Sequence, residues 1–137
     1  MAASTAPIYS RLSDVQWINA SLANTTKDLT SGTIYLVWTA DATNGGFLDQ
    51  VVFQPLGTNT ATVGRVWLNN GSATGTLANN VMLKDITLAA TTNSETAQIG
   101  QTAVSLALPV PAGYRIYVTL GTGVAGGFGV AAYAGKY

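Results

Sequence analysis

The stretch Tyr114-Arg115-Ile116-Tyr117-Val118-Thr119-Leu120 has the clearest alternation in the chain. Large apolar residues occupy every second position from 114 to 120, and the other set contains an arginine and a threonine. A period of two places the two sets on opposite faces of an extended backbone. The preceding residues 109–113 contain two prolines, each of which fixes φ and lacks the amide donor that a sheet ladder needs. We therefore predict a strand over 114–120 that follows a rigid corner at 109–113.

Seven further runs of β-branched and aromatic residues show related patterns, and glycine, Asn-Gly or proline separates them. They cover 13–20, 33–40, 47–54, 61–69, 81–89, 97–108 and 128–133. No run keeps a helical period over the roughly 10 residues at which a helix becomes the better interpretation. About eight short strands predict an all-β fold: a single-domain antiparallel β-sandwich, and eight is the strand number of a jelly roll. An up-and-down barrel and an immunoglobulin-like sandwich stay open, because spacing does not fix strand order.

Two of these runs are irregular. Gly64 interrupts the alternation between 61 and 69, and a glycine inside a strand pattern is a candidate bulge. The run from 33 to 40 has apolar residues on both faces, which indicates either an interior strand or a strand with a second contact surface.

The composition points to one neutral domain. The chain has 137 residues, of which 47% are hydrophobic and 9% charged, against about 25% charged in an ordinary soluble domain. Disorder is excluded, because disordered segments are poor in apolar and rich in charged residues. Burying neutral Thr, Asn and Ser side chains costs far less than burying ions, and a net charge near zero favours association. Such a surface is suited to contact with other protein surfaces. The alternative is that threonine is simply a common residue of exposed strand faces, and both interpretations can hold.

Several functional classes are excluded by missing residue types. The chain has no cysteine and no histidine, which removes disulfides, thiol nucleophiles, Ser-His-Asp triads and nearly every zinc or haem site. With 6 basic and 6 acidic residues the net charge is zero, so the basic surface of a nucleic-acid-binding protein is absent. No apolar run has the length of a signal peptide or membrane span. We expect no cofactor, no metal, no nucleic acid and no membrane association. We also expect the protein to be synthesised in a cytoplasm.

The charged residues offer weak candidates for chemistry. Asp41 and Asp49 flank one predicted hairpin, and glycoside hydrolysis needs two carboxylates about 5 to 10 Å apart. A turn residue and an exposed strand residue are the favoured interpretation of this pair. Arg65 and Arg115 fall within predicted strands, where pairing with an acid such as Asp49 or Asp85 competes with a solvated edge position. The acids are too dispersed for a calcium loop.

Three tryptophans, Trp17, Trp38 and Trp67, could form a sugar-stacking platform of the kind found in carbohydrate-binding modules. Trp38 and Trp67 lie in the middle of strong strand patterns, which favours positions in the core.

Two segments are candidate interfaces. Residues 1–12 lack strand alternation, so we divide the chain into an N-terminal arm over 1–12 and a sandwich domain over 13–137. In the arm, Ile8, Tyr9 and Leu12 provide apolar surface to bury on a neighbouring subunit. The second segment is the polar loop that follows the run 61–69. Its candidate interface residues are Asn69, Asn70, Asn79 and Asn80.

Several strings in the chain resemble small structural proteins of tailed bacteriophages. They are Thr39 to Gly46, Pro55 to Asn59, Arg65 to Gly71, Pro111 to Ile116 and Val118 to Thr122. In size and β-rich pattern the chain is similar to capsid decoration (cement) proteins with a jelly-roll fold. The matches are turn and strand signatures, without a catalytic motif.

This resemblance implies a non-enzymatic virion protein, located on the outer capsid surface, that binds the major capsid protein and stabilises capsomer junctions. It also implies a homo-oligomer, a dimer or a trimer, made in the host cytoplasm. The alternatives are a structural protein of a phage tail, baseplate or fibre, a carbohydrate-binding β-sandwich module, and a glycan hydrolase.

Overall fold

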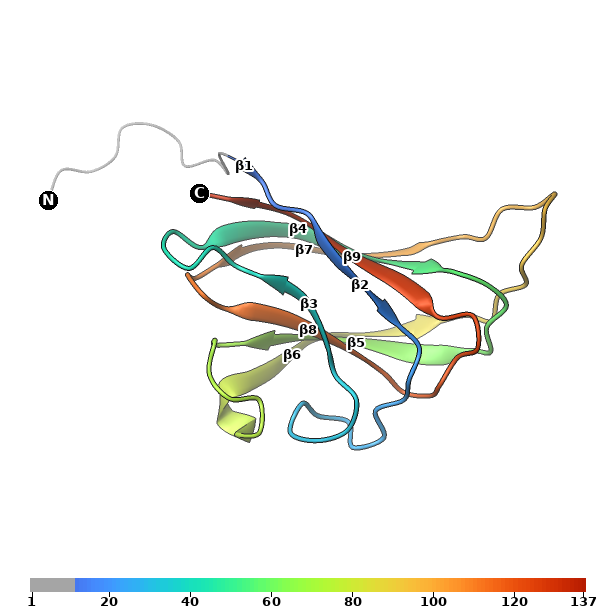
Figure 1. Cartoon of the computed structure of the whole chain (residues 1–137), viewed down its shortest axis with the longest axis horizontal. Coiled ribbons are helices and arrows are strands. Elements are labelled where there is room, and N and C mark those ends of the chain that lie inside the picture. The colour runs from blue at the N-terminus through green and yellow to red at the C-terminus, as the bar shows by residue number, and fades with distance from the viewer. Residues whose placement is uncertain (1–11) are drawn as a thin grey trace, which may run out of the picture.

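The computed structural model describes residues 12–137, which form nine strands and one short 3-10 helix. Figure 1 shows two sheets packed face to face. The elements are β1 (Leu12–Ser13), β2 (Gln16–Ala20), β3 (Tyr35–Thr39), β4 (Gly46–Pro55), β5 (Thr62–Asn69), η1 (Leu77–Asn79), β6 (Asn80–Leu88), β7 (Thr102–Val110), β8 (Arg115–Leu120) and β9 (Phe128–Lys136). The predicted all-β sandwich is confirmed.

The strand order is that of a jelly roll. One sheet has the order β1-β9-β4-β7, with β2 following β1 along the same edge of β9, and the other has the order β3-β8-β5-β6. All of these neighbours are antiparallel. The nested pairs β2–β9, β3–β8, β4–β7 and β5–β6 amount to one long hairpin wound into two sheets. This order excludes the up-and-down barrel and the immunoglobulin-like sandwich.

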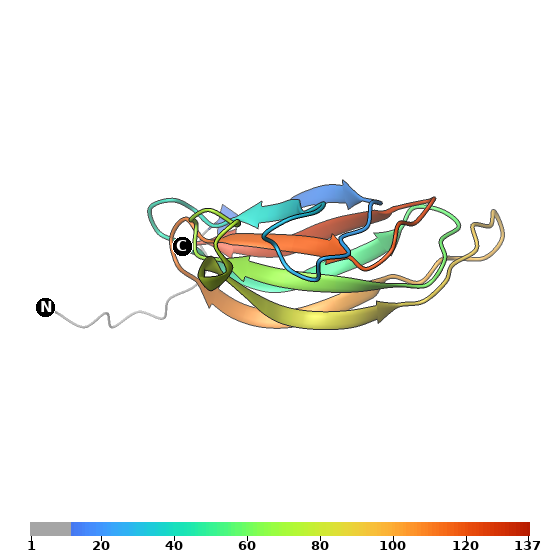
Figure 2. The same cartoon turned by 90° about the horizontal axis from the view of Figure 1, so that it is seen from below.

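The two long sides of the sandwich differ. Figure 2 shows β2 and β3 along one side and β6 and β7 along the other. Side chains join β2 to β3: Gln16 Nε2 donates to the Thr39 carbonyl at 3.2 Å, and Gln16 Oε1 accepts from the Thr39 amide at 3.1 Å. Next to them the Trp38 indole N–H donates to Asp14 Oδ2 at 3.0 Å. These bonds fix the position of β2 over β3, although the two strands belong to different sheets.

Three predicted boundaries were wrong. The run 13–20 is divided into β1 and β2, and residues 97–101 belong to a loop, so that β7 starts at Thr102. The predicted corner at 109–113 begins later, because Pro109 is part of β7, opposite Phe47. Proline is tolerated there because β7 is an edge strand, where one missing ladder donor costs little.

Gly64 is not at a bulge. It pairs regularly with Ile86 on one side and Leu120 on the other. A Cβ at this position would lie 3.0 Å from Leu88 Cδ1 and 3.1 Å from the Phe53 ring. The glycine therefore lets two core side chains approach the backbone of β5.

Bulges occur instead at positions that the alternation did not indicate. The register shifts between Val66 and Trp67, and both side chains are buried, on opposite faces of β5. In β3 it shifts between Leu36 and Trp38, which buries Trp38 together with its neighbour Val37. β3 is an edge strand, which excludes the interior-strand alternative for its two apolar faces and leaves the alternative of a second contact surface.

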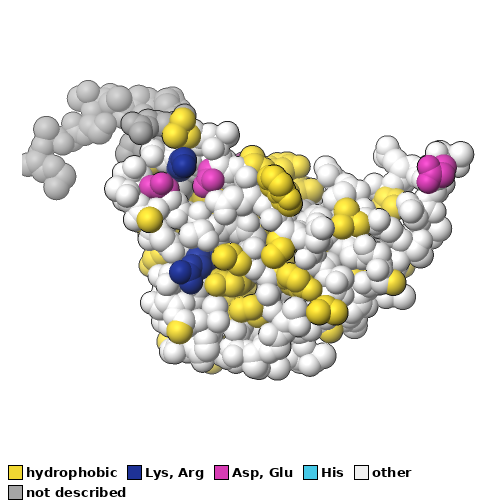
Figure 3. Space-filling model, in the orientation of Figure 1, with side chains coloured by type: hydrophobic (Ala, Val, Ile, Leu, Met, Phe, Trp, Pro, Cys, Tyr) yellow, Lys and Arg dark blue, Asp and Glu magenta, His cyan; other side chains and the backbone are white. Residues whose placement is uncertain are grey.

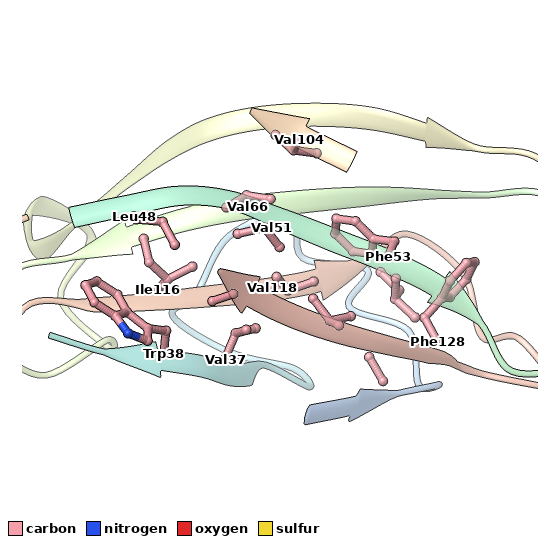
Figure 4. Packing of buried hydrophobic residues seen from close by; sticks show 14 of the residues in the cluster. Val37, Trp38, Leu48, Val51, Phe53, Val66, Val104, Ile116, Val118 and Phe128 are labelled. Atoms are coloured by element: carbon pink, nitrogen blue, oxygen red, sulfur yellow. The ribbon is translucent and has the colours of Figure 1, made fainter. Parts of the chain in front are cut away.

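The core fills the space between the sheets (Figure 4). Phe53 and Phe128 meet edge to face, with ring centroids 6.3 Å apart and an interplanar angle of 84°. The inward residues of β8, Ile116, Val118 and Leu120, are fully buried. A second, smaller cluster of Leu29, Trp67 and Tyr117 lies on the side of the β3-β8-β5-β6 sheet that points away from the main core. The loop between β2 and β3 thus covers part of that face.

Replacement of Gly64 by alanine is expected to destabilise the fold by about 1–3 kcal/mol, because the new methyl overpacks the core against Phe53 and Leu88. Urea unfolding measures the change. The matched control is Gly100→Ala, where a Cβ meets nothing within 4 Å, and its stability is expected to change by no more than about 0.5 kcal/mol. Equal stabilities of the two variants would show that Gly64 has another role.

Candidate interaction surfaces

The outward face of the β1-β9-β4-β7 sheet, here called the outer face, is nearly free of charge. Its central row runs from Trp17 through Ala131 and Val52 to Ala103, because paired residues of antiparallel strands point to the same side. Trp17 is 72% exposed. Among the outward residues of β2, β4, β7 and β9, Asp49 is the one charged side chain. Figure 3 shows hydrophobic side chains spread over the visible surface and few charged ones.

A groove of about 340 Å³ crosses one end of this face. Its lining residues are Leu12, Ser13, Val15, Phe47, Asp49, Tyr133, Ala134 and Gly135. Gly135 lies between Ser13 of β1 and Phe47 of β4 in the sheet register. Phe47 therefore stands on one side of this glycine, Leu12 and Val15 flank Ser13 on the other, and the Asp49 carboxylate also lines the groove.

Of the three residues predicted to form the arm interface, only Leu12 lies in the part of the chain that the structure describes. Ile8 and Tyr9 lie outside the described residues. Leu12 is the first residue of β1, pairs with Lys136 and lines the groove with 55% of its surface exposed. The domain boundary predicted after residue 12 thus falls inside β1.

The asparagines of the loop between β5 and β6 bond to that loop. Asn69 is fully buried; its Nδ2 donates to Asn80 Oδ1 at 2.8 Å, and its Oδ1 accepts from the Gly71 amide at 2.8 Å. Asn79 Nδ2 donates to the Ala73 carbonyl at 2.9 Å. In this way the amide groups hold the loop in shape.

The loop exposes a leucine that was not among the asparagines predicted to form its interface. Asn70 is exposed, but its Nδ2 donates to Asn79 Oδ1 at 3.2 Å. Leu77, which the sequence analysis passed over, is 65% exposed. A large apolar residue in an otherwise polar loop was the available signal.

The two carboxylates considered for catalysis are, as the sequence favoured, a turn residue and an exposed strand residue. Asp41 Oδ1 accepts from the amides of Asn44 and Thr43, at 2.8 and 3.0 Å, and forms a turn. Asp49 is exposed and lies at the register shift between Leu48 and Gln50. Within residues 12–137 no three His, Cys, Asp or Glu side chains gather in a group that could hold a metal ion.

Arg65 forms the predicted ion pair with Asp85, with 3.8 Å between Nε and Oδ1. The pair contributes little to stability, because about half of the Asp85 side chain is exposed. Arg65 Nη1 is buried without a hydrogen-bond partner in the described part of the chain. Arg115 lies in β8 between Asn69 and Thr39.

The tryptophans separate into two buried residues and one exposed residue. Trp38 belongs to the main core, and Trp67 to the smaller cluster, where its Nε1 donates to Thr119 Oγ1 at 3.1 Å. The predicted burial of both is confirmed. A three-tryptophan platform is therefore absent, and Trp17 is left as the exposed ring.

Comparison with known proteins gives no relative for this chain. No family model matches it, and neither a curated protein nor a solved structure does. Within residues 12–137 no helix is long and apolar enough to span a bilayer.

Asp28 and Asp41 are expected to make two turns sensitive to acid. Hydrogen bonds from Thr30, first from its hydroxyl and then from its amide, lower the pKa of Asp28, and the amides of Asn44 and then Thr43 lower the pKa of Asp41. A folded-state pKa below the unfolded one means that the stabilisation is present above the unfolded value and is lost as pH falls through the folded value.

Carboxyl titration by NMR should therefore give midpoints below 3.8 for both groups. A peptide spanning residues 39–46 is the reference for Asp41, and its aspartate should titrate at the ordinary value, about 3.9. Equal midpoints in the peptide and the protein would contradict the turn geometry.

Proposed function

We propose that this chain is a non-enzymatic structural protein of a tailed-bacteriophage virion that decorates the outer surface of the head and stabilises its capsomer junctions. The observation that carries the proposal is a jelly-roll sandwich with a nearly charge-free, partly apolar outer face. The resemblance of its turn and strand strings to small structural proteins of tailed bacteriophages, and of its size and β-rich pattern to capsid decoration proteins, supports the proposal.

The outer face is suited to permanent contact with protein. Exposed large hydrophobic residues such as Trp17, Val15 and Tyr133 lie together on it, and such patches mark interaction sites. Neutral side chains lose little hydration energy when a partner covers them. With zero net charge, copies of the chain do not repel one another.

The fold provides a stiff body for bridging. Two antiparallel sheets enclose one core, and hydrogen bonds between Gln16 and Thr39 close one side of the sandwich. Each copy makes several modest contacts with the major capsid protein and with its neighbours in a dimer or trimer. Multivalent attachment then gives a long residence time without any single strong site.

The loop between β5 and β6 is the contact that we assign to the head. Leu77 projects from it, and the asparagine hydrogen bonds hold the loop in shape. A pre-shaped loop loses little entropy on binding.

Purified protein is expected to add saturably to isolated heads that lack it, and Leu77→Asp should weaken this addition tenfold or more. Burying a leucine side chain contributes about 1.5–3 kcal/mol, and about 1.4 kcal/mol is a factor of ten. Sedimentation of heads with bound protein, at increasing protein concentration, measures the effect.

The matched control for that assay is Thr87→Asp, which adds the same charge at an exposed position of β6. It should bind as the unmodified chain does. If unmodified protein fails to attach to heads and gold-labelled protein marks tails, baseplates or fibres in negative-stain images, the head assignment is wrong and the tail alternative replaces it.

Carbohydrate binding is a second candidate, favoured by the exposure of Trp17. The apolar face of a pyranose ring can stack on an exposed indole, and polar side chains flank this one. Asn19 and Gln54 occupy the neighbouring row, on either side of Gly129. An aromatic surface beside a few hydrogen-bonding groups is the usual composition of a ligand site.

Titration with soluble polysaccharides tests this candidate. Because Trp38 and Trp67 are buried, a saturable change in tryptophan fluorescence would come from Trp17, and Trp17→Ala should abolish it. Leu22→Ala, a change at an exposed apolar residue that leaves all three tryptophans in place, is the control. Unchanged fluorescence across plant, bacterial and capsular polysaccharides would dismiss carbohydrate binding.

A further inference from the structure

We infer that the groove at the end of the outer face receives residues 1–11 of a second copy of this chain, so that neighbouring copies are joined by exchanged N-terminal segments. The inference rests on the self-association included in the proposed function, and it names the partner and the contact.

The groove is shaped for side chains of an extended segment. Leu12 and Val15 stand on one side and Phe47 on the other, while Tyr133 and Gly135 belong to β9, which lies between β1 and β4 in the sheet. Its volume of about 340 Å³ is near the lower end of ligand cavities. Such a volume accommodates a few side chains and is too small for a folded domain.

The sequence of residues 1–11 matches this groove chemically. It contains two adjacent large apolar residues, Ile8 and Tyr9, with Arg11 as its one charged side chain. The groove offers apolar walls and the exposed carboxylate of Asp49, which forms no ion pair within residues 12–137. Apolar and charged groups are thus complementary between the segment and the groove.

The direction of β1 favours a neighbour's segment over the chain's own. Leu12 pairs with Lys136 and Ser13 with Gly135, so β1 reaches the end of β9 at its first residue. The groove begins at Leu12 and extends back along the sheet, over Ser13, Val15 and Gly135. Three residues separate Ile8 from Leu12, too few to reverse direction and still lie extended in the groove. A segment from another copy needs no reversal.

Exchange of this kind sets the form of the assembly. Reciprocal exchange between two copies closes a dimer, and head-to-tail exchange around an axis closes a trimer or larger ring. Each junction buries the apolar walls of the groove and pairs Arg11 with Asp49.

Disulfide trapping tests the inference cleanly, because the chain has no cysteine of its own. Two single variants, Ile8→Cys and Val15→Cys, are mixed at micromolar concentration in a glutathione redox buffer. Exchange should link the two different chains about tenfold faster than a control mixture of Ile8→Cys with Thr87→Cys, whose second cysteine is exposed on β6. Non-reducing gels and mass spectrometry of the linked peptides give the rates.

Two further measurements complete the test. Asp49→Asn should lower the trapping rate several-fold, and circular dichroism checks that each variant is folded. The double variant Ile8→Cys with Val15→Cys should form links between chains. A link within one chain, or a rate no higher than the control, overturns the inference. No heads are present in this assay, so failed addition to heads would leave its result intact.

Discussion

The burial of one side of β8 between the sheets is the constraint on which the rest of the structure depends. Ile116, Val118 and Leu120 are fully buried and belong to the main core. A slip of one residue would replace them with Arg115, Tyr117 and Thr119. β8 lies between β3 and β5, so its register fixes theirs, and the bonds from Gln16 to Thr39 carry this order to β2 and the outer face.

The sequence predicted the strands well because alternation is a local property. Strand order, bulges and exposure depend on partners distant in the chain. Gly64 was misinterpreted because the Phe53 ring that it accommodates comes from the other sheet. Among the candidate interface residues, Leu12 is exposed as expected and Asn69 is buried in a hydrogen-bond network. The groove could not be predicted, since β1, β4 and β9 meet only in the folded sheet.

The neutral surface and the stiff sandwich together support the proposed role. A nearly charge-free face can be covered at low desolvation cost, which suits a protein that works in an assembly. The proposed self-association and the proposed attachment to a shell involve different parts of the molecule: the groove and residues 1–11 for the first, and the loop that carries Leu77 for the second. Weak contacts of both kinds reinforce one another when many copies bind.

Cryo-electron microscopy of empty heads incubated with the purified chain tests the central claim most directly. We predict jelly-roll density on the outer surface at capsomer junctions, in a fixed ratio to the major capsid protein. Heads with no added density at saturating protein concentration would contradict a role in head decoration.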